Sequence, residues 1–504
     1  MLRKVRIICS LTTAILLTCY LVNVADVMPA WFSVIAEIQI LPLFLSSNFI
    51  VLGVMLIVAI VFGRVYCSSI CPLGLYQDCV NWIAKKLNKK KRFRFTAAHT
   101  AIRWVFVSIS VLAFLSGFTV LVGLLDPYSL YSRFAVHVLK PGYAMGNNVA
   151  ALIFSSFENQ SFAKVSVYFL SLSSLLITIT TTAFVGYLAW INGRMYCNTV
   201  CPVGTVLGLV SKVSIFKVRI NDSLCNSCGT CSRTCKASCI DSKAHKVDSS
   251  RCINCFDCLY VCSESAIKYS YSFRLPVKNR KKVVNASRRR FMMAVGASGL
   301  AAGKMLAEKS SSVLGSKKIV RSIPITPPGS LSADHLLRKC TSCHLCVSKC
   351  PTNIIKPAFL QYGIAGMMQP TLSFDNDYCT YECTVCSEVC PTGALRAFNP
   401  EQKMRNQMGQ VQFLFRNCIV FTNTESCGKC VRICPTQALY LVDYKNGLSI
   451  PAVNTSLCVG CGACEYICPA TPNKAIYVEG ISEHRQISLP KKMPALPATD
   501  DFGF

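Results

Sequence analysis

Four stretches of the chain are apolar and long enough to cross a lipid bilayer as helices, which takes about 20 consecutive residues. None of the four contains a charged side chain, and a buried helix of a soluble protein seldom reaches such a length without one. We therefore predict four membrane spans, at residues 7–25, 38–63, 104–125 and 165–193.

The basic residues of the short connections orient these spans, because Lys and Arg collect on the cytoplasmic side of membrane proteins. Three basic residues precede the first span, and nine lie between residues 64 and 103. The connections at 24–37 and 126–164 carry few basic residues. This pattern predicts a four-span membrane domain over residues 1–215, with a cytoplasmic N-terminus and two periplasmic connections.

Beyond the fourth span the apolar pattern gives way to polar, cysteine-rich sequence. We expect a cytoplasmic domain at 216–275, a basic linker at 276–319, a second soluble domain at 320–480 and a C-terminal tail at 481–504. The predicted fold class is therefore an α-helical membrane domain joined to α+β ferredoxin-like domains.

The linker contains Ser-Arg-Arg-Arg-Phe-Met at 287–292, and 13 uncharged residues follow from position 291 to 303. This pattern is typical of a twin-arginine export signal. The alternative is a basic linker that leads into a short soluble helix, since the stretch is shorter than a membrane span. We favour the signal, because that route exports folded domains whose metal centres are already built. The domain at 320–480 is then periplasmic.

The composition agrees with this mixed layout, since the 504-residue chain is 52% hydrophobic and 15% charged. A net charge of +29 is common in proteins that bind nucleic acid, but no pattern of interleaved basic and aromatic residues accompanies it. We therefore exclude nucleic-acid-binding proteins. The 32 cysteines would suggest disulfides in an exported protein. However, repeated gaps of two residues crowd disulfide geometry and suit one face of a metal cluster.

Residues 225–262 contain two runs of four cysteines with the spacing of a two-cluster ferredoxin. In such domains three closely spaced thiolates hold one [4Fe–4S] cluster, and the fourth cysteine of the run ligates the other. The first predicted ligand set is Cys225, Cys228, Cys231 and Cys262. The second is Cys235, Cys252, Cys255 and Cys258. Zinc is the alternative, although its sites usually pair two cysteines with two distant ones.

This domain departs from the ferredoxin pattern in one respect. Lys236 and Ser263 stand where a proline commonly follows the fourth cysteine of each run, which changes the loop exit without removing a ligand. Cys239 is a spare thiol that would be able to replace Cys235, and we interpret it as a packing residue.

The C-terminal domain contains four further cysteine runs, and a proline follows the last cysteine of each. The runs are Cys340, Cys343, Cys346 and Cys350; Cys379, Cys383, Cys386 and Cys390; Cys418, Cys427, Cys430 and Cys434; and Cys458, Cys461, Cys464 and Cys468. We predict six [4Fe–4S] clusters in total and leave the pairing of these four runs open. Cys340 to His344 also fits a c-type haem attachment sequence, but a haem would strand Cys346 and Cys350.

The ends of the second and fourth predicted spans match each other as Gly-Arg-x-Tyr-Cys-x3-Cys-Pro-x-Gly, at 63–74 and 193–204. Such agreement implies an internal duplication. Packing of the two copies would bring together four cysteines, which we predict as a site for iron, a small cluster or a redox-active disulfide pair: Cys67, Cys71, Cys197 and Cys201. The alternative is that they pack as small apolar residues at structural turns.

These motifs resemble two known families. Residues 1 to about 275 resemble NapH-type membrane ferredoxins, which are related to NosR and share four spans, paired Cys-x3-Cys-Pro turns and a pair of cluster motifs. Residues 287 to about 480 resemble NapG and MauM-type ferredoxins, which have a twin-arginine leader and four cluster motifs. The chain thus resembles a fusion of the two.

The resemblance implies a protein of the bacterial inner membrane that oxidises quinol, such as menaquinol, during anaerobic respiration. The electrons would pass to a periplasmic reductase or cytochrome. From the residues themselves, Asp126 and His137 are groups able to accept quinol protons, although a solvated surface loop is the more common explanation.

Two other functions remain open. In the first, the chain carries electrons from a reduced cytoplasmic donor across the membrane. In the second, it acts as an assembly factor for a periplasmic reductase. No nucleotide-binding glycine loop or catalytic triad pattern is evident, so we expect mainly an electron carrier whose enzymatic role is at most that of a quinol dehydrogenase component.

Overall fold

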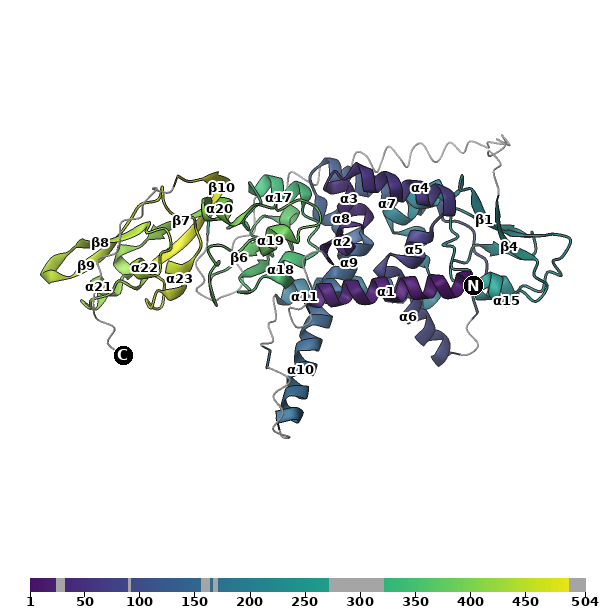
Figure 1. The fold of residues 1–504 in the computed structure, drawn as a ribbon, viewed down its shortest axis with the longest axis horizontal. Coiled ribbons are helices and arrows are strands. Elements are labelled where there is room, and N and C mark those ends of the chain that lie inside the picture. Colours follow the sequence, from purple (N-terminus) through teal and green to yellow (C-terminus); the bar gives the residue numbers. More distant parts are fainter. Residues whose placement is uncertain (24–31, 89–91, 156–163, 166–170, 272–320, 489–504) are drawn as a thin grey trace.

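The computed structural model describes residues 1–504 apart from 24–31, 89–91, 156–163, 166–170, 272–320 and 489–504. The molecule is elongated, with a helical part in the middle and a smaller domain with β-strands at each end (Figure 1). The predicted twin-arginine signal and most of the linker lie outside the described residues.

The helical part precedes both of the others in the chain. Its helices are α1 (Leu2–Val22), α2 (Ser33–Glu37), α3 (Ile40–Leu45), α4 (Phe49–Phe62), α5 (Val65–Ser69), α6 (Pro72–Leu87), α7 (Thr100–Leu115), α8 (Thr119–Leu125), α9 (Pro127–Phe134), the π-helix η3 (Ala135–Leu139), α10 (Lys140–Ser155), α11 (Leu172–Asn192), α12 (Met195–Thr199) and α13 (Pro202–Ser211). One apolar core joins α1 to the repeat helices and continues into the first ferredoxin domain.

Two of the four predicted spans are single long helices. Within the part of the chain that the structure describes, α1 and α11 are the helices whose length and composition would let them cross a membrane. The second predicted span is divided at Ser47, which has a positive φ of 60°, and Asn48 then caps α4 by accepting from the Val51 amide. The third is divided at Gly117, where φ is 81°. Polar capping and turn residues thus interrupt runs whose average apolarity is that of a span.

The duplicated motif folds in the same way in both copies. The first copy lies on α4, α5 and α6, and the second copy lies on α11, α12 and α13. The short helices α5 and α12 occupy matching positions in the two copies. Pro72 and Pro202 each begin a helix directly after a cysteine, as expected for a residue that lacks an N–H and has a fixed φ.

The first ferredoxin domain is built on one antiparallel strand pair. β1 (Phe216–Ile220) pairs with β4 (Ile267–Tyr271), and Ile220 faces Ile267 in the register. Between them lie α14 (Thr230–Thr234), β2 (Ile240–Asp241), β3 (Lys246–Val247) and α15 (Asp257–Val261). Each short helix carries the third cysteine of a run, so the strand pair holds the two cysteine runs side by side.

The C-terminal part contains two further pairs of cysteine runs and two separate apolar cores. Its elements are α17 (Ala333–Lys339), α18 (Leu345–Lys349), β5 (Ile355–Pro357), η4 (Ile364–Gly366), β6 (Pro370–Leu372), α19 (Val385–Glu388), α20 (Pro400–Met404), β7 (Asn406–Phe413), η5 (Phe415–Asn417), α21 (Ile419–Thr422), α22 (Lys429–Arg432), β8 (Leu439–Asp443), η6 (Lys445–Gly447), β9 (Ser449–Val453), α23 (Ala463–Ile467) and β10 (Ile476–Gln486). β10 pairs with β7 and continues past position 480, where we predicted the tail to begin.

Candidate metal centres

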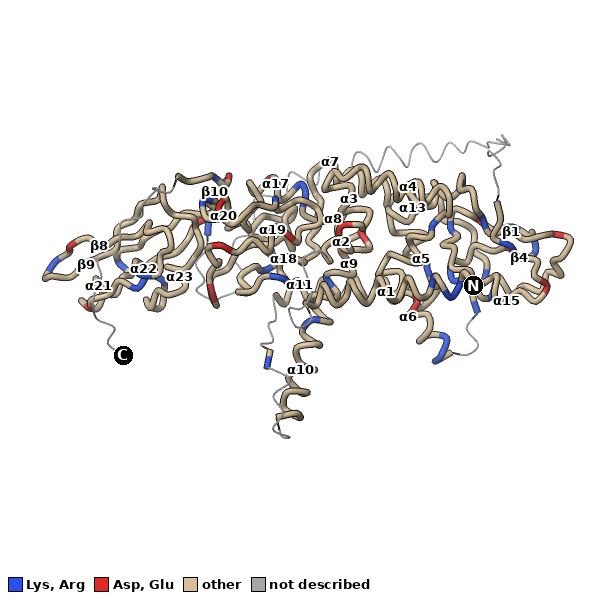
Figure 2. Tube along the Cα trace, in the orientation of Figure 1, with Lys and Arg blue, Asp and Glu red and all other residues tan. Residues whose placement is uncertain are grey.

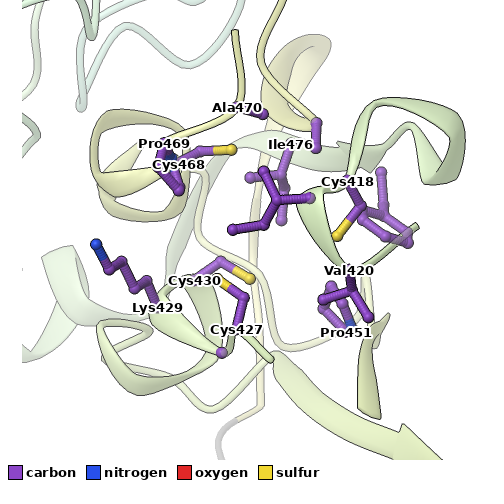
Figure 3. A pocket seen from close by; sticks show the side chains of 14 residues that line it. Cys418, Val420, Cys427, Lys429, Cys430, Pro451, Cys468, Pro469, Ala470 and Ile476 are labelled. Atoms are coloured by element: carbon purple, nitrogen blue, oxygen red, sulfur yellow. The ribbon is translucent and has the colours of Figure 1, made fainter. Parts of the chain in front are cut away.

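Four cysteines surround a cavity at the far end of the C-terminal part. Cys418, Cys427 and Cys430 come from one run and Cys468 from the next, and their sulfurs turn toward a common space (Figure 3). The cavity has a volume of about 400 Å³ with the space open to solvent, and its other walls are mostly apolar. The last cysteine of one run therefore completes the set formed by the first three cysteines of the run before it.

The neighbouring cavity receives the complementary set. Cys434 joins Cys458, Cys461 and Cys464 around a volume of about 310 Å³. The last cysteine of each run thus faces the first three of the other, which is the arrangement of two-cluster ferredoxins.

The first ferredoxin domain shows the same exchange. Cys225, Cys228, Cys231 and Cys262 line a cavity of about 380 Å³. For the second predicted set, burial raises the pKa of the Cys258 thiol, and the nearby Cys255, Cys252 and Cys235 raise it further. The structure therefore brings together the members of both predicted sets.

The remaining two runs also exchange their last cysteines. Burial raises the pKa of Cys346, and the nearby thiols of Cys340, Cys343 and Cys390 add to the effect. The same holds for Cys386, whose neighbours include Cys379, Cys350 and Cys383. The six sites are thus three crossed pairs.

Four of the ligand loops share a backbone that non-glycine residues seldom adopt. The residues on both sides of the second cysteine have φ between 51° and 82° in each: Ser227 and Gly229, Asn254 and Phe256, Ser342 and His344, Gly460 and Gly462. Successive N–H groups around such a turn form a concave nest that favours anions. Because side chains in this region cost energy, the loops are shaped for a bound group. Four soft thiolates, apolar walls and these nests fit a [4Fe–4S] cluster.

Three threonines also contact cluster cysteines. In each Cys-Pro-Thr turn the threonine Oγ1 lies 3.6–3.7 Å from the cysteine Sγ, in the pairs Cys350–Thr352, Cys390–Thr392 and Cys434–Thr436. The fourth C-terminal run has Ala470 at this position. Our reading of the sequence overlooked these residues, although the repeated Cys-Pro-Thr is visible there.

Cys239 lies next to the second site of the first ferredoxin domain. Its Sγ is 3.6 Å from that of Cys235, and its side chain is buried. The structure thus keeps Cys239 beside the cysteine that it would be able to replace.

The four cysteines of the duplicated motif are all buried in the core of the helical part. Burial raises the pKa of the Cys67, Cys71 and Cys201 thiols, and the nearby Cys197 adds to the effect at each, so the four lie near one another. Among the described residues, no group of three or more His, Cys, Asp or Glu side chains converges as the ligands of a single metal ion would.

Two buried arginines tie the copies of the motif together reciprocally. Arg64 donates to the Cys197 carbonyl at 3.0 Å, and Arg194 donates to the Cys67 carbonyl at 2.9 Å. Gly74 and Gly204 make room for them, since a β carbon at either position would press on the opposite arginine. The sequence signal was the arginine directly after the first glycine of each copy, which we had not assigned a role.

Asp126 and His137 lie in a buried interface and not on a solvated loop. Asp126 caps α9 by accepting from the Ser129 amide at 2.8 Å, and burial raises its pKa to about 6. His137 Nε2 is 2.8 Å from His344 Nδ1 and 3.0 Å from Ser174 Oγ, and burial lowers the His137 pKa to about 4.

The C-terminal part contacts the helical part through the first cluster loop. Thr119 of α8 donates to the Cys340 carbonyl at 2.8 Å, and Ser132 of α9 donates to the Cys343 carbonyl at 2.7 Å. Arg133, which is fully buried, donates to the Ser342 carbonyl.

The first ferredoxin domain contacts the opposite end of the helical part. Arg64 donates to the Ser250 carbonyl, and the Arg194 amide donates to the carbonyl of Lys236, the residue after Cys235. Burial opposes ionisation of Asp78, but Arg194, Lys236 and Arg6 together hold its pKa below the ordinary range. The arginines that join the motif copies thus also join this domain.

The chain matches known iron–sulfur families over several segments. A family described as "4Fe-4S binding domain" matches residues 45–90 and 170–221, which contain the two copies of the duplicated motif. Families described as "4Fe-4S dicluster domain" match residues 339–394, 425–471 and 248–354. No solved structure matches the chain.

Curated relatives are ferredoxin-type proteins. "Ferredoxin-type protein NapF" of Escherichia coli K12 is 32% identical over 155 residues, which cover 31% of this chain and 85% of NapF. "Methylamine utilization ferredoxin-type protein MauM" of Methylobacillus flagellatus is 30% identical over 31% of this chain and 69% of MauM. "Putative electron transport protein YccM" of Escherichia coli K12 is 25% identical over 48% of this chain and 60% of YccM.

Proposed function

Since the chain belongs to the ferredoxin-type 4Fe-4S proteins, a family that includes NapF, we propose that it passes electrons from a membrane quinol to a periplasmic reductase or cytochrome. The observation that carries this proposal is the contact between α8, α9 and the Cys340–Cys343 loop. A carrier that takes electrons at the membrane needs its first cluster against the part that enters the membrane, and this loop contacts the helical part that we propose for that role.

Six [4Fe–4S] clusters would be held by the crossed cysteine sets, and each supplies a one-electron acceptor when it is bound. The chain's own residues would hold the clusters in thiolates, surround them with apolar side chains and donate hydrogen bonds to sulfur from threonine and backbone groups, such as the Ser342 and Leu395 amides. The division into domains at 1–215, 216–275, 276–319 and 320–480 belongs to the same proposal, with the last domain extended to the end of β10 at Gln486.

The proposed topology has four spans, a cytoplasmic N-terminus and first ferredoxin domain, and a periplasmic C-terminal part exported through the twin-arginine signal. In favour of it, Lys and Arg gather around the N-terminus, the end of α6 and the first ferredoxin domain (Figure 2). Positive residues remain on the cytoplasmic side. We place the protein in the bacterial inner membrane and, as the resemblance implies, consider it a fusion of NapH-like and NapG-like units.

The test is reduction of the purified full-length chain by menadiol, a soluble quinol. Protein purified without oxygen should contain about 24 iron atoms per chain, and menadiol should bleach its cluster absorbance as dithionite does. Clusters that dithionite reduces and menadiol leaves oxidised would overturn quinol as the donor. Zinc in place of iron would overturn the carrier itself.

A second function is favoured by the position of Cys67, Cys71, Cys197 and Cys201. These cysteines lie in the core that connects the helical part with the first ferredoxin domain, and a centre there would extend the row of clusters through the membrane. The chain would then conduct electrons from a cytoplasmic donor. Serine at Cys67 and Cys197 separates the two functions: normal reduction of the C-terminal clusters by menadiol in this variant supports the quinol route and counts against the conduit.

A further inference from the structure

A cavity lies where three parts of the chain meet: the C-terminal end of α1, the start of α10 and helix α18 of the first C-terminal site. Its volume is about 530 Å³ with the space open to solvent. Its walls are largely apolar and include Val22, Val136, Ala144 and Val347, with the polar side chains of Lys140 and Asn353. Ligand sites commonly combine an apolar pocket with a few polar groups.

The wall formed by α18 lies between the ligands of two different clusters. Val347 and Ser348 line the cavity, and they separate Cys346 from Cys350 by a single helical turn. Cys346 belongs with Cys340, Cys343 and Cys390, whereas Cys350 belongs with the neighbouring set. A molecule in this cavity would therefore contact the turn of α18 that joins ligands of two one-electron acceptors.

One wall of the cavity is formed by the start of α10, a helix suited to a lipid surface. α10 projects away from the long axis of the molecule, across the direction of α1 (Figure 1). It carries exposed apolar side chains, including Met145, Val149 and Leu152, and its one charged residue, Lys140, lines the cavity. An exposed apolar helix with its charge at one end is typical of a segment in a membrane interface.

From these observations we infer that the cavity is the binding site for the quinol headgroup. This inference rests on the proposed function. Oxidation of one quinol to quinone releases two electrons and two protons. The cluster that Cys346 would help to hold and the cluster that Cys350 would help to hold would each accept one of these electrons, and both protons would leave to water. Lys140 lies at the wall of this cavity, where its Nζ donates to the carbonyl oxygen and to the Oγ of Ser348 and so fixes the start of α10 against α18.

The test is binding of 2-heptyl-4-hydroxyquinoline N-oxide, a fluorescent quinol analogue, to the full-length chain in lipid nanodiscs. Ala144→Trp fills the cavity from α10, and we expect it to weaken binding by about tenfold or more, because the headgroup loses its space. Val149→Trp is the matched control, since it adds the same side chain to an exposed position of the same helix. Equal affinity in the two variants would overturn the inference.

A second measurement needs no variant. An azidoquinone activated by light should label wild-type peptides that contain Lys140–Ala144 or Val347–Asn353, and labelling of other peptides alone would overturn the site. The proposed function fails in a different way. If menadiol reduces wild type and Ala144→Trp equally fast, quinol is still the donor but binds elsewhere, whereas no reduction of wild type would remove quinol altogether.

Discussion

The backbone of Gly123 in α8 lies against the carbonyl oxygen of Thr341 so closely that no β carbon fits between them. Thr341 follows Cys340 in the first loop of the C-terminal part, and Thr119 of the same helix holds the Cys340 carbonyl at 2.8 Å. The distance between the helical part and its nearest cluster is therefore set by a residue without a side chain.

Gly123→Ala should loosen this contact. The added methyl group would push the Thr341 backbone away, and overpacking of this kind costs about 1–3 kcal/mol. We expect amide hydrogen exchange in α8 and the Cys340 loop to become about tenfold faster or more, and reduction by menadiol to slow. Gly146→Ala is the control, since no atom lies within 4 Å of a β carbon there. Unchanged exchange in Gly123→Ala would mean that the two parts are not docked in this way.

Arg64→Lys should destabilise the helical part. The fully buried guanidinium donates to Asn198 Oδ1 at 2.8 Å and to the carbonyls of Ser250 and Cys197 at 3.0 Å, and a lysine cannot satisfy all three in that geometry. The free energy of unfolding should fall by about 2–3 kcal/mol. Titration with dodecyl sulfate, followed by tryptophan fluorescence, measures it.

The control for this change is Arg338→Lys. Arg338 pairs with Asp334 on an exposed helix, where both side chains are 70% accessible. Such a surface pair contributes at most about 1 kcal/mol, so the substitution should change the unfolding free energy very little. Similar losses in the two variants would contradict a bridging role for Arg64.

Thr352→Val should lower the midpoint potential of the cluster held through Cys350. A hydroxyl that donates to a ligand sulfur stabilises the more negative, reduced state. Loss of one such bond, worth about 1 kcal/mol, corresponds to about 40 mV for one electron. Ala470→Thr should raise the midpoint potential of the cluster held through Cys468, because it creates the Cys-Pro-Thr turn found in the other three C-terminal runs. An EPR-monitored redox titration resolves both changes, and shifts of the same sign would contradict the role of the hydroxyl.

His484→Gln should reduce the acid sensitivity of the C-terminal part. His484 accepts from or donates to Thr326 Oγ1 at 2.7 Å, and burial lowers its pKa from 6.5 to about 4. A depressed histidine pKa contributes stability above pH 6.5 that is lost as the pH falls toward 4. From about pH 7.5 to 5.5 His484 should account for a loss of about 1 kcal/mol, so the variant should lose about 1 kcal/mol less than wild type. Thermal unfolding at both pH values measures it, and the exposed His99→Gln should keep the wild-type loss.

The spacing of the cysteines sufficed to predict which of them lie close together where the chain itself brings them into one compact domain. Cys225 and Cys262 belong to one compact domain, and the strand pair of Ile220 with Ile267 leads both into the same cavity. The duplicated motif was equally visible, because its residues lie in one continuous stretch in each copy.

Two kinds of feature could not be predicted from the sequence: local breaks within the apolar runs, and contacts between distant segments. Ser47 and Gly117 divide two apolar runs whose average composition is that of a span. The reciprocal bonds of Arg64 and Arg194 join residues that are 133 and 127 positions apart in the sequence. No local pattern specifies a partner at that separation. Likewise, the buried contact of His137 with His344 requires the C-terminal part to be docked, so a loop interpretation was natural from the sequence alone.

The crossed pairing of the last two runs makes a prediction that separates it from clusters built within each run. In the structure Cys468 shares a cavity with Cys418, whereas Cys434 belongs to the other cavity. Alanine at Cys468 should remove one cluster, or about four iron atoms. Adding Cys418→Ala should remove no more iron, because that cluster is already lost, but adding Cys434→Ala should remove about four atoms more.

Clusters assembled within each run would give a different result, because Cys418 and Cys434 would then share one cluster and Cys468 would belong to another. Both double variants would lose two clusters, and Cys418→Ala with Cys434→Ala would lose only one. Iron and acid-labile sulfide per chain, measured on anaerobically purified protein, distinguish the two patterns. Protein whose C-terminal cores no longer fold would lose more than two clusters, so a graded loss also shows that the rest of the domain is intact.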